Sequence, residues 1–184
     1  MATYVILLCA VNVGGTGKLP MAELRRLLGG LGCKRVETYI QSGNAVVDAT
    51  GSAARVMRET AAALGQQMGA QVDVLVRTHA EMERVVAGNP FATEAAADGA
   101  RVHVAFLSGK AAAGAEDELQ QIVKKNPGRR DRFQLGEGVV YLHLPDGAAE
   151  TKFTTKAMGR AVGCAVTARN WNTVVKLTEM AARE

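Results

Sequence analysis

Three glycines and a lysine lie close together near the start of the chain, between an apolar run and a helical pattern. The stretch reads Asn12-Val13-Gly14-Gly15-Thr16-Gly17-Lys18-Leu19-Pro20 and follows the apolar run from Tyr4 to Val11. Backbone amides of glycines can approach a ligand closely, and the dipole of a helix that begins there favours negative charge. The spacing therefore predicts a loop that binds the phosphate or carboxylate of a small anionic or nucleotide-like ligand.

The stretch departs from two established phosphate-binding motifs. Gly17-Lys18 matches the end of the Walker A pattern, but Asn12 stands in place of its first glycine and Leu19 in place of its final hydroxyl residue. The dinucleotide pattern G-x-G-x-x-G fails as well, because Pro20 stands at its third glycine. A loop whose glycines only let the chain turn is the alternative interpretation.

The composition indicates a folded protein with an aliphatic core. Of its 184 residues, 48% are hydrophobic and only 4% are aromatic, so aliphatic side chains must fill the interior. The net charge of +4 permits anionic partners without requiring them. The N-terminal apolar run lacks a basic leading region and is too short to span a bilayer, so we interpret it as a strand and expect no membrane partner.

The cysteines and histidines carry no metal-binding pattern. Cys9, Cys33 and Cys164 are far apart and show no Cys/His spacing typical of zinc, so we expect three free thiols in a cytoplasmic protein and no metal site. His79, His103 and His143 are isolated from one another, and no pattern identifies a cofactor or a catalytic residue. Whether the protein is an enzyme, and how many subunits it has, are left open by the sequence.

Apolar periodicity predicts the same order of elements twice. The first half reads as strand 3–10, then a helix that begins at residue 20 and is ended by Gly29, Gly30 and Gly32, then strands 36–41 and 45–48. A second helix follows, marked by Met57, Ala61, Leu64 and Met68, and after it strand 72–76. A capping box of Thr78 and Glu81 begins the last helix of this half. The second half reads as strand 101–108, a helix with Leu119, Ile122 and Val123, strands 132–135 and 139–144, helix 154–162, strand 166–169 and helix 171–182.

Each half is therefore a βαββαβ run followed by one helix, which is the ferredoxin-like order. We predict an α+β protein of two tandem ferredoxin-like subdomains, at residues 1–90 and 101–184, with a linker at 91–100. In this topology the first and second strands run the same way, so Asn12 to Lys18 should lie beside the turn Gln41-Ser42-Gly43-Asn44. In the second half, Pro145 to Thr155 and Arg169 to Thr173 should share one edge.

Three stretches carry a family resemblance: Asn12-Val13-Gly14-Gly15 with Leu19-Pro20-Met21, Tyr39-Ile40-Gln41-Ser42-Gly43-Asn44, and Arg169-Asn170-Trp171-Asn172-Thr173. Together they resemble the bacterial family called domain of unknown function 1697, nearly end to end. The resemblance implies two ferredoxin-like subdomains and no established activity. The chain departs from the family pattern at Cys9-Ala10, where an Arg-Gly pair is common, so an anion-binding arginine there would be absent.

The predicted ligand site combines residues from both halves. Trp171 could stack on a flat ring and Arg169 could pair with a phosphate or carboxylate, in a groove that the two subdomains share. The alternative is structural: Trp171 fills space and Asn170 caps the last helix. Lys152, Thr154, Thr155 and Lys156 are a further phosphate candidate or an ordinary helix start. The candidate ligand-binding residues are Asn12, Gly14, Gly15, Gly17, Lys18, Gln41, Ser42, Asn44, Arg169, Asn170, Trp171 and Asn172.

Two other functions are kept as alternatives. The densest basic patch comprises Lys124, Lys125, Arg129, Arg130 and Arg132, and it could contact nucleic-acid phosphates or simply be a solvated helix end. An RNA-recognition sheet would show aromatic residues on its central strands, and residues 45–48 have none. The last alternative is a structural or interaction protein without a ligand.

Overall fold

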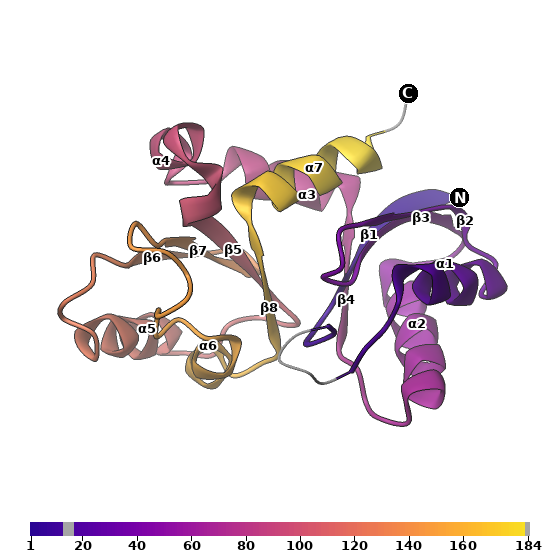
Figure 1. Ribbon diagram of the computed structural model, residues 1–184, viewed down its shortest axis with the longest axis horizontal. Coiled ribbons are helices and arrows are strands. Elements are labelled where there is room, and N and C mark those ends of the chain that lie inside the picture. Colours follow the sequence, from indigo (N-terminus) through magenta and orange to yellow (C-terminus); the bar gives the residue numbers. More distant parts are fainter. Residues whose placement is uncertain (13–16, 183–184) are drawn as a thin grey trace. The chain divides into compact units, whose positions relative to one another are not determined.

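The computed structural model describes residues 1–12 and 17–182 and divides them into two compact units (Figure 1). One unit comprises Met1–Arg84 with Lys176–Glu184, and the other comprises Val85–Val175. The division falls inside two helices, α3 (His79–Ala87) and α7 (Trp171–Ala181). The last helix was expected to belong wholly to the second half, but its C-terminal part groups with the first unit instead.

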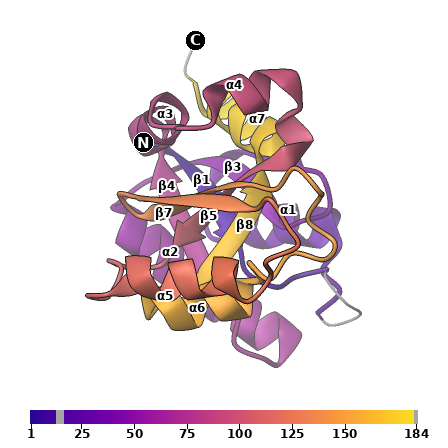
Figure 2. The same ribbon diagram turned by 90° about the vertical axis from the view of Figure 1, so that its left-hand side faces the viewer.

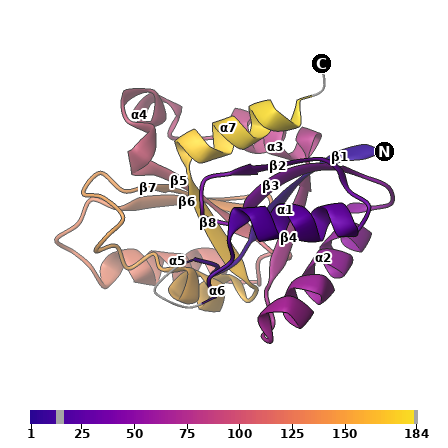
Figure 3. The ribbon, with the colours of Figure 1, turned by 45° about the vertical axis from the view of Figure 1, so that its right-hand side comes forward.

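The first unit contains the expected ferredoxin-like order. Its elements are β1 (Ala2–Leu8), α1 (Met21–Gly30), β2 (Lys34–Tyr39), β3 (Asn44–Ala49), α2 (Ala53–Met68) and β4 (Val74–Thr78). The sheet order is β2-β3-β1-β4 and every neighbouring pair is antiparallel. Figure 3 shows α1 and α2 together on one face of this sheet.

The apolar residues of β1 explain its central place in that sheet. Tyr4, Ile6 and Leu8 pack into the core beneath the two helices, while Val5 and Leu7 on the opposite face are also fully buried. A strand covered on both faces needs a continuous apolar run, and this is what the sequence has.

The sequence features that predict the helices are present in the structure, with small differences in where a helix begins and which residues it buries. Thr78 and Glu81 form the predicted capping box: the Thr78 amide donates to Glu81 Oε2 (2.7 Å) and the Glu81 amide to Thr78 Oγ1 (3.2 Å). Pro20, expected as the first helical residue, is extended and immediately precedes α1. In α2 the buried face is Val56, Thr60 and Leu64. Met57, expected to mark that face, is 36% exposed.

The second unit repeats the order around its own sheet. Its elements are α4 (Ala92–Ala97), a 3₁₀ turn (Gly99–Arg101), β5 (Val102–Leu107), α5 (Ala115–Lys124), β6 (Arg132–Gly136), β7 (Val139–His143), α6 (Thr155–Val162) and β8 (Val166–Asn170). The sheet order is β6-β7-β5-β8, again antiparallel throughout. Figure 2 shows α5 and α6 side by side on one face of this sheet and α4 on the other.

The segment 91–100, expected to be a linker, is folded. It contains α4 and most of the 3₁₀ turn, and the side chains of Phe91 and Ala95 are buried. Of the alanines in α4 only Ala95 is buried, whereas Ala92, Ala96 and Ala97 are exposed, which explains why the composition looks like that of a linker. The side-chain oxygen of Asn89 accepts a hydrogen bond from the Phe91 amide (2.9 Å), which stabilises the turn just before α4.

Candidate functional site

The end of β1 and the β2–β3 turn lie at the same edge of the first sheet. Leu7 and Tyr39 both pair with Asn44, and the Leu8 amide donates to the Gly43 carbonyl (2.9 Å). The expected neighbourhood of the two segments is thus present in the described residues. Gly14 and Gly15, which were predicted to contact the ligand there, lie outside the described residues.

Asn12 ties the two segments together through its side chain. Its Nδ2 donates to the carbonyl oxygens of Leu19 and Gln41, each at 2.8 Å, and its Oδ1 accepts from the Leu19 amide at 2.8 Å. The Asn12 amide also donates to the Gly17 carbonyl (3.2 Å). Both side-chain donors are therefore committed to the backbone, so Asn12 shapes the loop.

Left-handed backbone is concentrated at this edge. Ala10, Asn12 and Ile40 have φ angles of 53°, 56° and 49°, and among the described non-glycine residues only Arg35 joins them. Such conformations cost about 1–3 kcal/mol each for most non-glycine residues, less for asparagine, and cluster at functional sites. Ile40 is the most unusual of the three because a β-branched side chain disfavours positive φ, and its side chain is nevertheless 49% exposed.

The remaining candidates of the first unit differ in accessibility. Gly17 and Lys18 are exposed, as is Gln41, and Ser42 is half-buried. Asn44 is fully buried and its Nδ2 donates to the Tyr39 carbonyl (3.1 Å), so it stabilises the turn. Polar groups that a ligand could reach are therefore concentrated at Gly17, Lys18, Gln41 and Ser42.

The candidates of the second unit hold their own unit together. Arg169 is buried, and its Nη1 donates to Thr167 Oγ1 (2.7 Å) and to the Ala168 carbonyl (2.9 Å). Asn170 caps α7, because its Oδ1 accepts from the Thr173 amide (2.9 Å). The Asn172 amide group lies directly against Gly99, where an added Cβ would stand 2.1 Å from Oδ1. Trp171 is half-buried.

The three arginines of the basic patch are paired with carboxylates. Arg129 Nε lies 3.1 Å from Asp131 Oδ2, Arg130 Nη2 lies 2.6 Å from Asp146 Oδ1, and Arg132 bonds to Glu94. The hydrogen bond from Arg130 lowers the pKa of the Asp146 carboxyl. Since the pairs neutralise most of the patch, a contact to nucleic-acid phosphates would rest on the exposed Lys124 and Lys125.

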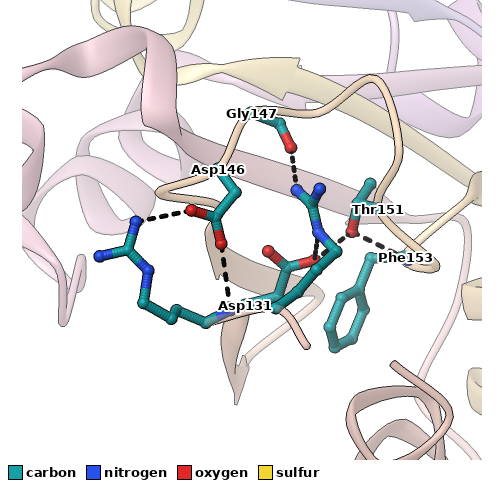
Figure 4. Close-up of polar contacts among 7 residues, drawn as sticks. Asp131, Asp146, Gly147, Thr151 and Phe153 are labelled. Atoms are coloured by element: carbon teal, nitrogen blue, oxygen red, sulfur yellow. Dashed lines mark hydrogen bonds and ion pairs between the residues drawn. The ribbon is translucent and has the colours of Figure 1, made fainter. Parts of the chain in front are cut away.

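A network of polar contacts closes the β7–α6 loop over the second core (Figure 4). Asp131 Oδ2 also accepts from Thr151 Oγ1 (2.7 Å), and Thr151 Oγ1 accepts from the Phe153 amide (3.2 Å). Arg129 donates from Nη2 to the Gly147 carbonyl. Phe153 is buried, with its ring 5.8 Å from that of Phe133. Sequence reasoning missed this network, although one aspartate, Asp131, stands among the three arginines of residues 129–132 and was its signal.

A small cavity of about 20 Å³ lies between the end of α1 and α2 and is lined by Cys33, Glu59 and Thr60, among others. Burial, followed by the negative charge of Glu59, raises the pKa of the Cys33 thiol. The thiol is therefore protonated and a poor nucleophile. Among the described residues no group of three or more His, Cys, Asp or Glu side chains could hold a metal ion. Cys9, Cys33 and Cys164 are free thiols.

Two antiparallel sheets, each built by a βαββαβ run, define a protein of tandem ferredoxin-like units. The chain belongs to the family described as protein of unknown function (DUF1697), which matches residues 1–141. The solved structure of the conserved bacterial protein SP0830 from Streptococcus pneumoniae is similar, with a TM-score of 0.68 and 20% sequence identity over 98% of this chain and 99% of that one. None of the curated proteins matches the chain. In the part of the chain that the structure describes, no helix has the length and apolarity needed to cross a membrane.

Proposed function

We propose that this protein binds a small anionic or nucleotide-like ligand at the edge of the first sheet, through the loop 12–18 and the turn 41–43. The observation that carries the proposal is the left-handed backbone of Ala10, Asn12 and Ile40 at this one edge. A fold retains such costly conformations where the surrounding contacts enforce them, and they are typical of ligand-contacting segments.

The accessible groups at this edge suit an anion. Lys18 supplies an exposed positive charge and Gly17 an exposed backbone, and Gln41 adds an exposed side-chain amide. Charge-assisted hydrogen bonds from such donors to a phosphate or carboxylate are about twice as strong as neutral ones. The exposed Ile40 side chain offers an apolar surface next to these donors, which favours a ligand with a flat or apolar part attached to the anion.

The proposal rests on the first unit. Arg169, Asn170 and Asn172 have hydrogen bonds or close packing within the second unit, which accounts for their residue types without a ligand. The expected groove shared with residues 169–173 stays a prediction.

A panel of phosphate, carboxylates and nucleoside monophosphates, screened by thermal unfolding, tests the proposal. A ligand at a hundred times its dissociation constant stabilises the native state by about 2.7 kcal/mol, which is a large shift in melting temperature. Lys18→Ala should reduce the shift, and Lys124→Ala, in the basic patch, should leave it unchanged. If no compound of the panel shifts unfolding, or if Lys124→Ala alone abolishes the shift, the proposed site is wrong.

A further inference from the structure

Four side chains hold α4 against the second sheet. Glu94 lies in α4, and Phe91 is the residue just before this helix. Arg132 and His143 are direct cross-strand partners on β6 and β7. Arg132 Nη2 bonds to Glu94 Oε1 and lies 3.0 Å from His143 Nδ1. The Arg132 guanidinium carbon is 5.0 Å from the centre of the Phe91 ring, and that ring is 5.8 Å from the His143 ring. One guanidinium thus contacts all three of the other side chains.

The contact between Arg132 and His143 depends on the protonation state of the histidine. A guanidinium only donates hydrogen bonds, so the Nδ1 atom facing it can accept one only when the imidazole is neutral with its proton on Nε2. Protonation would place an N–H donor against the N–H donors of Arg132 and a second positive charge beside the first. The contact between the two side chains is therefore available to one form of the histidine only.

We propose that His143 is a pH-sensitive switch for the docking of α4. At neutral pH it accepts a hydrogen bond from Arg132 and keeps the guanidinium over Phe91 and beside Glu94. When His143 takes up a proton, Arg132 is repelled, both contacts to α4 weaken, and the population in which the short helix is open from the sheet increases. The surface that opens includes the side chains of Phe91 and Ala95, which are buried when α4 is docked.

The charges around His143 determine the direction of the effect. Burial, then Arg132, lower its pKa from the ordinary value of 6.5; Arg130 adds to this, while the carboxylates of Glu94 and Asp131 oppose it, and the net direction is downward. Below about pH 6.5 the unfolded chain binds more protons than the folded one, so the contribution to stability is complete above that pH and declines as the pH falls.

Hydrogen exchange of the whole chain tests the switch. Protection factors, which correct for the intrinsic pH dependence of exchange, are measured for the amides of residues 95–98, which donate within α4, at about pH 7.5 and about pH 5. The loss of one hydrogen bond from a charged donor, worth at least about 1.5 kcal/mol, predicts a decrease of about tenfold or more at the lower pH. The amides of β5 and β7 report whether the sheet itself stays intact.

Two variants separate the switch from a general loss of stability. His143→Gln retains an oxygen acceptor for Arg132 but cannot take up a proton, so the pH dependence in α4 should disappear while protection stays high. His79→Gln, which changes a histidine of α3 that pairs with Glu83, should behave like the unmodified protein. Equal protection at both pH values in the unmodified protein, or an unchanged pH dependence in His143→Gln, would overturn the proposal.

Discussion

The side-chain amide of Asn12 donates a hydrogen bond of 2.8 Å to the backbone carbonyl of Gln41, 29 residues further along the chain. The same Nδ2 donates to Leu19, so one asparagine connects the end of β1, the start of α1 and the β2–β3 turn. Its φ of 56° suits asparagine better than almost any other non-glycine residue, because its short polar side chain tolerates the left-handed region. The left-handed backbone and the side-chain hydrogen bonds at position 12 therefore both favour asparagine there.

Asn12→Ala should destabilise the protein by about 2–3 kcal/mol, because it removes three hydrogen bonds of about 1 kcal/mol each, in part replaced by water, and puts alanine in left-handed backbone. Asn12→Gly loses the same bonds without the backbone penalty and should be about 1 kcal/mol less destabilising. Urea unfolding measures both. Lys18→Ala, a change at an exposed residue nearby, serves as the control and should alter the free energy of unfolding by no more than about 0.5 kcal/mol. An Asn12→Ala variant as stable as that control would contradict the structural role.

Gly43→Ala should be among the most damaging single-methyl changes in the first unit. Its φ is +75°, and an added Cβ would stand 2.5 Å from Val11 Cγ2 and 2.8 Å from Leu8 Cβ. Overpacking of this kind costs about 1–3 kcal/mol, and left-handed backbone adds about 1–2 kcal/mol. Gly29→Ala on α1 is the matched control: nothing lies within 4 Å of its added Cβ, so the change should stabilise the helix by about 0.5–1 kcal/mol. A melting temperature that is higher for Gly43→Ala than for Gly29→Ala would refute this account.

Most of the fold could be predicted because it depends on local patterns. The apolar run of β1, the capping box at Thr78 and the alternation in β5 each specify an element, and the order of the elements specifies the sheet. The sequence failed at residues 91–100, where an alanine-rich helix has no apolar periodicity of its own. Its position depends on Phe91 and on the contact of Glu94 with Arg132, which are tertiary features.

The candidate site was harder to predict, because a residue type does not show where its hydrogen bonds go. Asn12 and Asn44 were chosen as polar residues in turns and Arg169 as a positive charge at the end of a strand, yet in the structure all three donate to the backbone or to a neighbouring side chain. Ile40 gave no signal of left-handed backbone, since isoleucine disfavours it. Such strain is specified by the surrounding contacts and can be found only in the structure.

Thr60→Val should stabilise the protein by about 1 kcal/mol. The Thr60 hydroxyl is fully buried on α2 and has no hydrogen-bond partner, whereas valine has nearly the same shape and carries no polar group to desolvate. Ser52→Ala in the same helix is the contrasting change, because Ser52 accepts from the Arg55 amide at the N-terminus of α2, and its loss should cost about 1 kcal/mol. The urea midpoint of unfolding should rise for Thr60→Val and fall for Ser52→Ala. A destabilised Thr60→Val variant would show that the Thr60 hydroxyl has a hydrogen-bond partner in solution.

The last prediction concerns the two ion pairs that hold the β7–α6 loop. Arg129 and Asp131 have side chains only 11% and 6% exposed, whereas Arg130, the partner of Asp146, is 74% exposed. Removing one partner of a buried pair leaves a charge without compensation and costs about 3–5 kcal/mol. Exposed pairs contribute about 0–1 kcal/mol and are screened by salt. Asp131→Ala should therefore destabilise the protein by about 3 kcal/mol or more, and Asp146→Ala by about 1 kcal/mol or less.

Salt and a second partner make the comparison specific. The effect of Asp146→Ala should shrink further in about 1 M salt, where the screening length is about 3 Å, while the effect of Asp131→Ala should persist. Because Asp131 also accepts from Thr151, Asp131→Ala and Thr151→Val should be non-additive in a double-mutant cycle. Equal losses from the two aspartate variants at low and high salt, with additive Asp131 and Thr151 effects, would mean that the network drawn in Figure 4 does not hold the loop.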